Sequence, residues 1–179
     1  MAIGATIHTF QVQLADIDRG VYEDLSLRVA RHASETGAFM FTRVLAYCLE
    51  HTEGIAFSEG ISATDEPAVL VKDATGRLTA WIEVGAPDAA RLHAGSMQAD
   101  RTVVYTHRDP AKVAAPWAGK RIHRADDVVL YSFDPGFVDA AVARLDRRNA
   151  LTLSVTERRI YLDVAGATLE SDIHAHGIG

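Results

Sequence analysis

Apolar and polar positions alternate along the start of the chain. Between residues 5 and 14, apolar side chains such as Phe10, Val12 and Leu14 alternate with polar ones, which is the pattern of a strand with one buried face. Residues 16–20 (DIDRG) are typical of a turn, and the alternation returns over residues 21–29 with one interruption at Glu23. The chain is therefore predicted to begin with an antiparallel hairpin.

A helical period replaces this alternation at about residues 35–50. Ser34 is the predicted N-cap, and Glu35 falls in the first turn, where the positive end of a helix favours a carboxylate. Arg31 and His32 precede it and are interpreted either as phosphate contacts or as ion-pair partners of Glu35. The local pattern favours the structural role, because first-turn acids are common in helices without any function.

Residues 65–85 (DEPAVLVKDATGRLTAWIEVG) predict a second hairpin with a tight turn at residues 74–76. Alternation from residue 78 places Trp81 and Glu83 on the face opposite the apolar one. Pairing across the turn brings Asp65 and Glu66 toward Glu83, and converging carboxylates suit a hard divalent cation. Alternatively, Asp65 and Glu66 solvate a loop and Glu83 lies on a half-exposed face. The spacing alone favours this second interpretation.

The rest of the pattern predicts a mixed sheet in an α/β fold. A short extended piece is expected at residues 55–57, and a helix at residues 87–98 begins with Pro87 and Asp88 and contains Gly95 as a weak point. Strands are expected at residues 102–106 and 128–133, so the order strand, helix, strand predicts a parallel crossover. A helix over residues 137–148 and a C-terminal hairpin of residues 151–155 and 159–164 complete the fold.

Two segments carry candidate chemistry outside the central hairpin. Residues 108–124 are predicted to be irregular and form the most basic segment, so Arg121 and Arg124 are candidate contacts for a polyanion; a solvated loop explains the same composition. The last residues are predicted to form a polar tail. His174 and His176 in this tail are only a weak signal of metal ligation.

Composition predicts a single globular domain over residues 1–179, with 48% hydrophobic and 23% charged residues. No apolar run is long enough to cross a bilayer and no secretory signal is visible, so a cytoplasmic protein without a membrane partner is expected. The single cysteine, Cys48, rules out an internal disulfide. The net charge of −6 argues against avid, non-specific binding to nucleic acid, but it leaves room for a local basic groove.

The motifs of several common enzyme classes do not occur in the sequence. Phosphate-binding glycine loops, the HExxH zinc motif and the GxSxG nucleophile motif are all absent. Cys48 lies in the middle of a predicted helix without a cation nearby in sequence, so a thiolate nucleophile is not expected. Carboxylate chemistry is the class that remains.

The chain resembles the YaeQ family. The match is carried by ATIHTFQVQLADIDRGVYEDLSLRVARHASET at the start, by GISATDEP, WIEVGAPDAARL and VVYT, and by LTLSVTERRIYL near the end. It covers nearly the whole chain, and RHxSET, DEP and WIExG in this order are fairly specific. The resemblance implies a fold similar to the PD-(D/E)XK nuclease core, a restriction-endonuclease-like mixed sheet flanked by helices, here with an N-terminal and a C-terminal antiparallel hairpin.

The resemblance also implies a metal site. Carried over by position, the acidic ligands of the nuclease core fall on Glu35, on Asp65 or Glu66, and on Glu83. In such sites the acids hold Mg²⁺, which activates a water and neutralises charge in the transition state.

The catalytic lysine of that core has no counterpart in this chain. It would stand two residues after Glu83, where the sequence has Gly85. Glycine has no side chain with which to orient water or to stabilise a developing oxyanion. Because some relatives of this fold relocate the group, Gln98 on the following helix is the nearest candidate for an auxiliary catalytic residue beside Glu83.

Three functions therefore stay open on the sequence. The first is a Mg²⁺-dependent phosphodiesterase that acts on nucleic acid. The second is a non-catalytic module that binds nucleic acid or a protein, and the third is a purely structural acidic cluster. The candidate contacts to nucleic acid are Arg31, His32, Arg121 and Arg124.

Overall fold

The computed structural model describes residues 4–58 and 65–178. The chain divides into two compact units, of which the first comprises Met1–Phe41 and Phe133–His174 and the second comprises Thr42–Ser132 and Ala175–Gly179. Both units are therefore assembled from segments that are far apart in sequence. The expectation that residues 1–179 fold as one domain stays a prediction.

The first unit is a mostly antiparallel sheet of five strands in the order β2-β1-β8-β9-β10. β1 pairs with β2 and with β8, and the second of these pairings is parallel, while β9 pairs antiparallel with β8 and with β10. The strands are β1 (Thr6–Asp16), β2 (Val21–Arg31), β8 (Arg148–Thr156), β9 (Arg159–Val164) and β10 (Ala167–Gly177). Both predicted terminal hairpins are confirmed, because β1 with β2 and β8 with β9 form them.

The alternation that predicted these hairpins corresponds to their buried face. Phe10 in β1 pairs with Leu27 in β2, and both are buried. In the C-terminal hairpin, Leu153 lies opposite Leu162, and both are again buried. The ring of Phe41, at the start of the first helix, lies 6.3 Å from the ring of Phe10 and extends this core.

The last predicted helix and the predicted tail differ from the structure. The helix α4 (Phe137–Val142) ends well before residue 148, because Asp146 and Asn149 form reciprocal hydrogen bonds of 2.8 Å that turn the chain into β8. The tail with His174 is not irregular but belongs to β10. Its buried side chains, Ser171 and Ile173, are too few for the alternation to stand out in the sequence.

The second unit is a mixed sheet in the order β7-β6-β5-β4-β3. β3 and β4 are antiparallel, β4 and β5 form the predicted central hairpin, and β5, β6 and β7 are parallel, so the predicted crossover is confirmed. The elements are β3 (Ile55–Phe57), β4 (Val69–Lys72), β5 (Leu78–Val84), α2 (Ala89–Gln98), β6 (Arg101–Thr106), α3 (Pro110–Ala114) and β7 (Val129–Phe133). β7 ends one residue into the first unit.

The helix α1 (Gly37–Leu49) begins two residues later than predicted. Thr36, not Ser34, caps it, because the Thr36 hydroxyl accepts a hydrogen bond of 3.0 Å from the backbone N–H of Phe39. Glu35 therefore precedes the helix. From Thr42 onward, α1 belongs to the second unit, where Tyr47 stacks on Phe57 with a ring separation of 4.7 Å.

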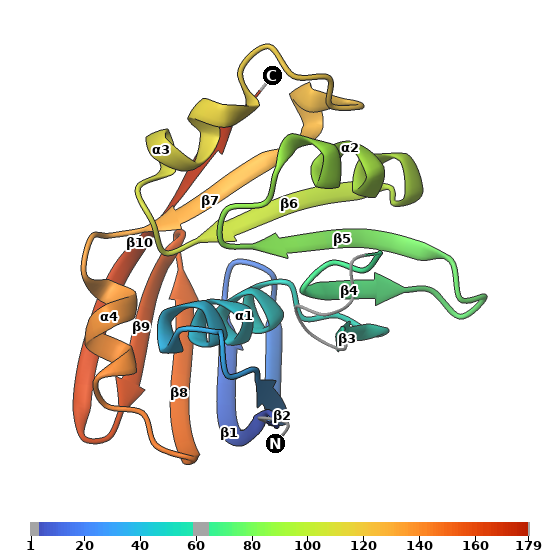
Figure 1. Cartoon of the computed structure of the whole chain (residues 1–179). Coiled ribbons are helices and arrows are strands. Elements are labelled where there is room, and N and C mark those ends of the chain that lie inside the picture. The colour runs from blue at the N-terminus through green and yellow to red at the C-terminus, as the bar shows by residue number, and fades with distance from the viewer. Residues whose placement is uncertain (1–3, 59–64, 179) are drawn as a thin grey trace. The chain divides into compact units, whose positions relative to one another are not determined.

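Helices α2 and α3 cover one face of the parallel strands of the second unit (Figure 1). Leu92 from α2 and Val113 from α3 pack with Val104 and Leu130 of the sheet. The segment 108–124 is thus not wholly irregular, as predicted, but contains α3 and a single 3₁₀ turn, Ala115–Trp117. Trp117 anchors that turn, since its indole N–H donates to the Pro87 carbonyl at 2.8 Å.

The close approach of α2 to β5 depends on Gly95. A Cβ atom at position 95 would lie 2.6 Å from the indole ring of Trp81, a distance that side-chain contacts do not tolerate. The glycine that looked like a weak point in the predicted helix is therefore the contact that lets Trp81 lie beneath α2, where it is 2% exposed.

Gly95→Ala should consequently destabilise the protein by about 1–3 kcal/mol, although glycine to alanine in a helix ordinarily stabilises by about 1 kcal/mol. Urea unfolding of the single variants and of a double-mutant cycle with Trp81→Leu measures this effect. In the Trp81→Leu background the alanine should become neutral or stabilising, because the ring that it would meet is gone. The same loss of stability in both backgrounds would show that the contact with Trp81 is not the cause.

Candidate functional site

Glu83 lies inside the sheet of the second unit and not on an exposed face. It occupies the next-to-last position of β5, opposite Val104 of the parallel strand β6, and it is 4% exposed. Trp81, two residues earlier on the same face, is also buried beneath α2. The interpretation of Glu83 as a half-exposed surface residue is therefore wrong, and its charge requires a partner inside the protein.

Arg91 from α2 is that partner. Its Nε donates to Glu83 Oε2 at 2.7 Å and its Nη2 to Glu83 Oε1 at 3.1 Å, which is the two-point geometry of a strong arginine–carboxylate pair. Arg91 itself is 30% exposed, so the pair reaches from the interior to the surface. The sequence interpretation did not include Arg91 among the candidate residues.

The position of Arg91 held a signal that sequence reasoning could have used. Asp88 caps α2 by accepting a hydrogen bond of 2.8 Å from the backbone N–H of Arg91, so Arg91 lies in the first helical turn. A cation is unfavourable at the positive end of a helix. An arginine at this position, eight residues after a carboxylate in a buried strand, therefore indicates a specific anionic partner.

Burial and ion pairing shift the pKa values of Glu83 and Arg91 in opposite directions. Burial raises the pKa of the Glu83 carboxyl above its ordinary value of 4.5, while the hydrogen bond and the charge of Arg91 oppose this shift. The hydrogen bond with Glu83 raises the pKa of Arg91, which keeps the guanidinium charged. Glu83 is thus a desolvated carboxylate held beside a permanent cation.

The other acidic candidates of this unit lie at the same end of the hairpin, as predicted. The pairing of Val69 with Ile82 directs the chain before β4 toward the end of β5, and Arg91 Nη2 also donates to the backbone carbonyl of Glu66. The Asp65 side chain is exposed and that of Glu66 is half-buried. Arg91 therefore ties the entry to β4 to the end of β5, and the assignment of Asp65 or Glu66 as a metal ligand stays a prediction.

Gly85 is required by the backbone at the position where the nuclease lysine is expected. Its φ is +91°, in the region that favours glycine, and its N–H donates to the Tyr105 carbonyl at 2.9 Å, where β5 ends. A lysine at this position would strain the backbone. The backbone conformation at the end of β5 therefore favours glycine over lysine at this position.

Gln98, the other candidate for a catalytic role, lies near the opposite end of α2 from Arg91. Its side chain is exposed, and its amide donates to the Ala94 carbonyl of its own helix at 3.2 Å. Arg91 is the α2 side chain that contacts Glu83. An auxiliary role for Gln98 stays a prediction.

The candidates before α1 belong to the first unit. Glu35 is 6% exposed, and its backbone carbonyl accepts a hydrogen bond of 3.0 Å from Arg31 Nε. His32 is exposed, and its Nδ1 lies 2.9 Å from the Ser34 hydroxyl. Metal ligation by Glu35 and nucleic-acid contacts by Arg31 and His32 stay predictions.

The two arginines of the basic segment differ from each other in their surroundings. Arg124 Nη2 donates to the carbonyls of Ser96 and Ala99, at 3.1 and 2.9 Å, and so binds the C-terminal end of α2. Arg121 has an exposed side chain. Arg124 therefore has a structural role, and contacts of either residue with nucleic acid stay predictions.

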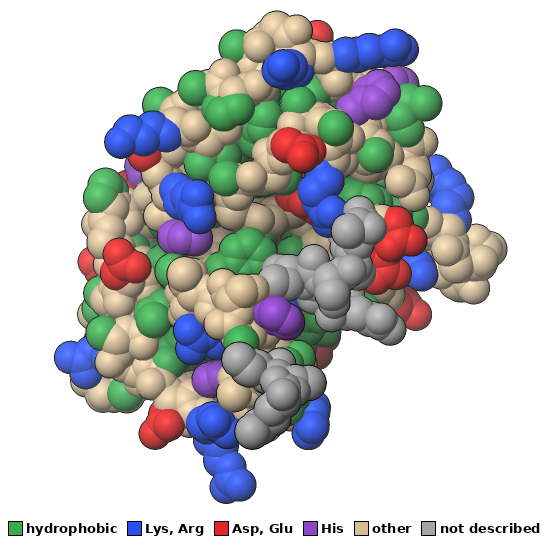
Figure 2. All heavy atoms as spheres, in the orientation of Figure 1, with side chains coloured by type: hydrophobic (Ala, Val, Ile, Leu, Met, Phe, Trp, Pro, Cys, Tyr) green, Lys and Arg blue, Asp and Glu red, His purple; other side chains and the backbone are tan. Residues whose placement is uncertain are grey.

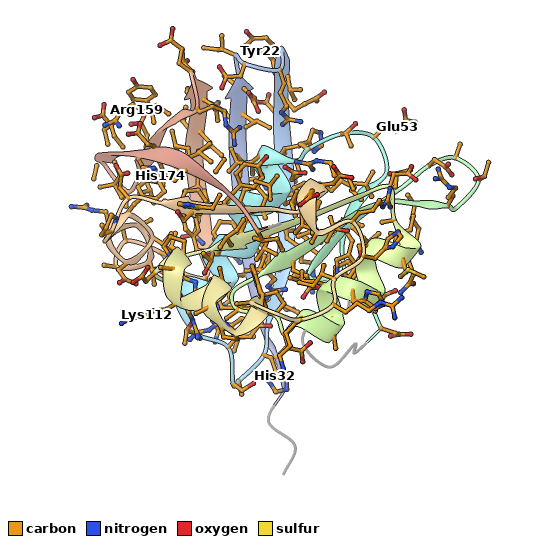
Figure 3. The ribbon with its side chains drawn as sticks, turned by 90° about the horizontal axis from the view of Figure 1, so that it is seen from above. Tyr22, His32, Glu53, Lys112, Arg159 and His174 are labelled. Atoms are coloured by element: carbon orange, nitrogen blue, oxygen red, sulfur yellow. The ribbon has the colours of Figure 1, made fainter. Side chains whose placement is uncertain are left out.

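A further group of metal-binding side-chain types occurs in the first unit. Within the described residues, Asp134, Asp172 and His174 form a group whose ligand atoms all lie within 4.8 Å of one another. His174 Nε2 lies 2.7 Å from Asp134 Oδ1, and Arg159 pairs with Asp172 across the neighbouring strands β9 and β10 (Figure 3). The Arg159–Asp172 ion pair and the hydrogen bond between His174 and Asp134 already account for this arrangement as a polar network at the surface.

Charges on the face shown in Figure 2 are dispersed. Acidic, polar and apolar side chains lie among the Lys and Arg side chains that this view shows. Across the described residues, none of the helices combines the length and the apolar character that crossing a membrane requires.

Taken together, the sheets and the Glu83–Arg91 pair define a mixed α/β protein with a carboxylate–arginine centre between a strand and its crossover helix. A family model described as YaeQ protein matches residues 1–173, so the chain belongs to the YaeQ family. It is 31% identical over 179 residues to "Uncharacterized protein YaeQ" of Escherichia coli strain K12, covering 98% of this chain and 97% of that protein. A Salmonella typhi relative of the same description is 29% identical over 178 residues, with the same coverage.

Two crystal structures of YaeQ proteins have the same fold. The protein from Xanthomonas axonopodis pv. citri superposes with a TM-score of 0.86 at 24% identity, over 98% of this chain and 99% of that one. The protein from Pseudomonas syringae superposes with a TM-score of 0.84 at 30% identity, over 96% and 95% of the two chains.

Arg91→Met should destabilise the protein by about 3 kcal/mol, because it leaves the buried Glu83 carboxylate without its counter-charge. Urea unfolding at neutral pH measures the loss. Arg77→Met is the matched control, since Arg77 pairs with Asp100 in the same unit but both side chains are more than half exposed, and it should cost less than about 1 kcal/mol. Equal effects of the two substitutions would contradict a special role for the Glu83–Arg91 pair.

The raised pKa of Glu83 predicts a particular pH dependence of stability. When the folded-state pKa lies above the unfolded value, protonation is coupled to folding; the contribution of Glu83 is then complete below the unfolded value of 4.5 and is lost as the pH rises through the folded-state pKa. The free energy of unfolding of the wild type, relative to that of Glu83→Gln, should therefore fall as the pH rises above the unfolded value of 4.5. An increase over this range would show that pairing with Arg91 outweighs burial.

Proposed function

We propose that this chain is a Mg²⁺-dependent, nuclease-like phosphodiesterase that acts on nucleic acid and has its centre at Glu83. The observation that carries the proposal is the contact of Arg91 with Glu83. Gly85 occupies the position at which the nuclease core has its catalytic lysine. Arg91, from the next helix, instead brings a permanent positive charge to the Glu83 carboxylate. The positively charged side chain that such a site needs would thus come from a different position in the chain.

The order of elements supports the same proposal. A helix, α1, precedes three antiparallel strands, β3 to β5, and the helix α2 then leads to the parallel strand β6. The acidic residues Asp65 and Glu66 open the segment that leads into β4, and Glu83 stands near the end of β5. This is the placement that the resemblance to the nuclease core implies for metal ligands in this part of the chain.

The residues of the second unit fit a hard cation. Both oxygens of Glu83 accept hydrogen bonds from Arg91, and a carboxylate oxygen has two lone pairs. Asp65 or Glu66, at the same end of the hairpin, would add a further carboxylate, and oxygen ligands are those that Mg²⁺ prefers. Bound Mg²⁺ would supply charge neutralisation and an activated water.

The chain's own residues have separable roles in such a site. Glu83 would hold the cation at a fixed point of a rigid strand. Arg91 orients the Glu83 carboxylate through two hydrogen bonds, and its guanidinium would stabilise the negative charge that develops on a phosphate. With a pKa that is raised by Glu83, Arg91 is not suited to act as a general base.

The second candidate function is a non-catalytic module that binds nucleic acid or a protein partner. The same ion pair favours it, because Arg91 already compensates the Glu83 charge and so reduces the electrostatic attraction that a cation would experience there. This function predicts a salt-dependent affinity without turnover.

Calorimetric titration with Mg²⁺ and with Mn²⁺ tests the first candidate. The wild type should bind metal saturably, and Glu83→Gln should abolish binding while keeping a neutral, isosteric side chain. Glu53→Gln is the control, because Glu53 is an exposed carboxylate of the same unit (Figure 3) and its loss should leave metal binding unchanged.

Hydrolysis of single- and double-stranded DNA and RNA with Mg²⁺ then separates the candidates. A phosphodiesterase should lose turnover in Glu83→Gln and retain part of it in Arg91→Lys, which keeps the charge. Binding of an oligonucleotide without cleavage by the wild type would favour the module. Neither metal binding nor cleavage, even with substrate and metal present together, would overturn the enzymatic proposal.

A further inference from the structure

A cavity of about 230 Å³ opens on the first unit, away in the sequence from the Glu83 centre. Arg31 at the end of β2, His8 in β1 and Arg147 just before β8 line it, together with Asp146. The first turn of α1 contributes Gly37 to the same wall. Every lining residue belongs to the first unit, so the cavity is formed by that unit alone.

The two arginines give the cavity more positive charge than its one lining carboxylate, Asp146, can balance. Arg31 uses its Nε for the Glu35 carbonyl at 3.0 Å, so its two Nη groups are not engaged by that bond. Arg147 bonds to Asp146 through its backbone N–H, at 2.8 Å, and not through its side chain. Among residues 4–58 and 65–178, no carboxylate forms an ion pair with either guanidinium.

Two like charges at one cavity are unfavourable unless an anion lies between them. Within the described part of the chain, the two arginines lack an acidic ion-pair partner, although the chain has a net charge of −6 and so contains more acidic than basic side chains. Guanidinium groups bind phosphate oxygens through pairs of N–H donors, which is the geometry that free Nη groups provide. The beginning of α1, with its partial positive charge, adds to the same field.

The remaining lining side chains limit the size and charge of the ligand. His8 is held in place on both ring nitrogens, by the Thr6 hydroxyl at 3.1 Å and by the Asp146 carbonyl at 3.4 Å. The single carboxylate, Asp146, leaves an excess of positive charge. The volume is below the range of about 300–1,000 Å³ that is usual for sites of drug-sized ligands, so the cavity suits a small anionic group.

We infer that this cavity binds a phosphate group through Arg31 and Arg147. The phosphate is either a free anion or the terminal phosphate of an oligonucleotide, and both present the same oxygens to the two guanidinium groups. The inference does not depend on metal binding or catalysis at Glu83, because that residue lies in the second unit.

The test is calorimetric titration of the full chain with inorganic phosphate and, separately, with a 5′-phosphorylated oligonucleotide and its unphosphorylated counterpart. Arg147→Gln and Arg31→Gln should each weaken binding of the phosphate-bearing probe by about ten- to hundredfold, as expected for the loss of a charge-assisted hydrogen bond. Arg148→Gln is the matched control: Arg148 is the next residue and is exposed, but it does not line the cavity, so affinity should not change.

The outcomes are distinguishable. Binding of inorganic phosphate that is lost in Arg147→Gln identifies a site for the free anion. Preference for the phosphorylated oligonucleotide, lost in the same variant, identifies a site for a strand end. No binding of either probe at millimolar concentration, or equal losses in Arg147→Gln and Arg148→Gln, would overturn the inference. Because Arg147 is exposed and makes no side-chain hydrogen bond within the described residues, its substitution tests the site even if Arg31→Gln does not fold.

Discussion

A carboxylate on an interior strand of a sheet has to be neutralised where it stands, and this requirement shapes the second unit. Glu83 loses its contact with water between β4, β6 and α2, and Arg91 restores a counter-charge through two hydrogen bonds. The arginine can reach the carboxylate only if α2 begins directly after β5, which the Asp88 cap ensures. The helix must then lie close to the strand along its length, and Gly95 above Trp81 provides the room.

The same ion pair connects stability with the proposed chemistry. A buried ion pair and an apolar replacement are often of similar stability. Stabilisation of the fold alone therefore does not explain why Arg91 is kept as a charged side chain that is 30% exposed. Arg91 instead reaches from the interior to the surface and also binds the Glu66 carbonyl, at the end of the hairpin where the acidic residues gather. An arrangement of this kind keeps a charged pair within reach of a ligand while holding it rigid.

Patterns along the chain predicted the elements whose cause is local. The hairpins followed from alternation, and the crossover from β5 through α2 to β6 followed from element order. β10 was not predicted, because few of its side chains are buried. α4 is shorter than predicted, because Asp146 and Asn149 turn the chain before residue 148. These causes depend on partners that are distant in sequence or on side-chain geometry.

For the candidate site, sequence reasoning placed Glu83 correctly at the end of a strand but not in the interior. Its burial results from a helix that the alternation of β5 does not reveal. Arg91 was missed because it was sought neither as a replacement for the lysine nor as the partner of a buried acid, whereas its unfavourable place in the first turn of α2 was visible. The cavity at Arg31 and Arg147 joins residues 116 positions apart, which no local pattern connects.

The parallel pairing of β1 with β8 has a consequence for how the protein is made. Thr9 lies opposite Arg148, so β1 leaves the ribosome well before its neighbour β8 has been synthesised. Until then the β1–β2 hairpin has an open edge, and the residues between Thr42 and Ser132 emerge and can begin to pack as the other unit. Long-range pairing of this kind makes folding slow, so the β1–β2 hairpin needs protection from association with other chains until β8 is available.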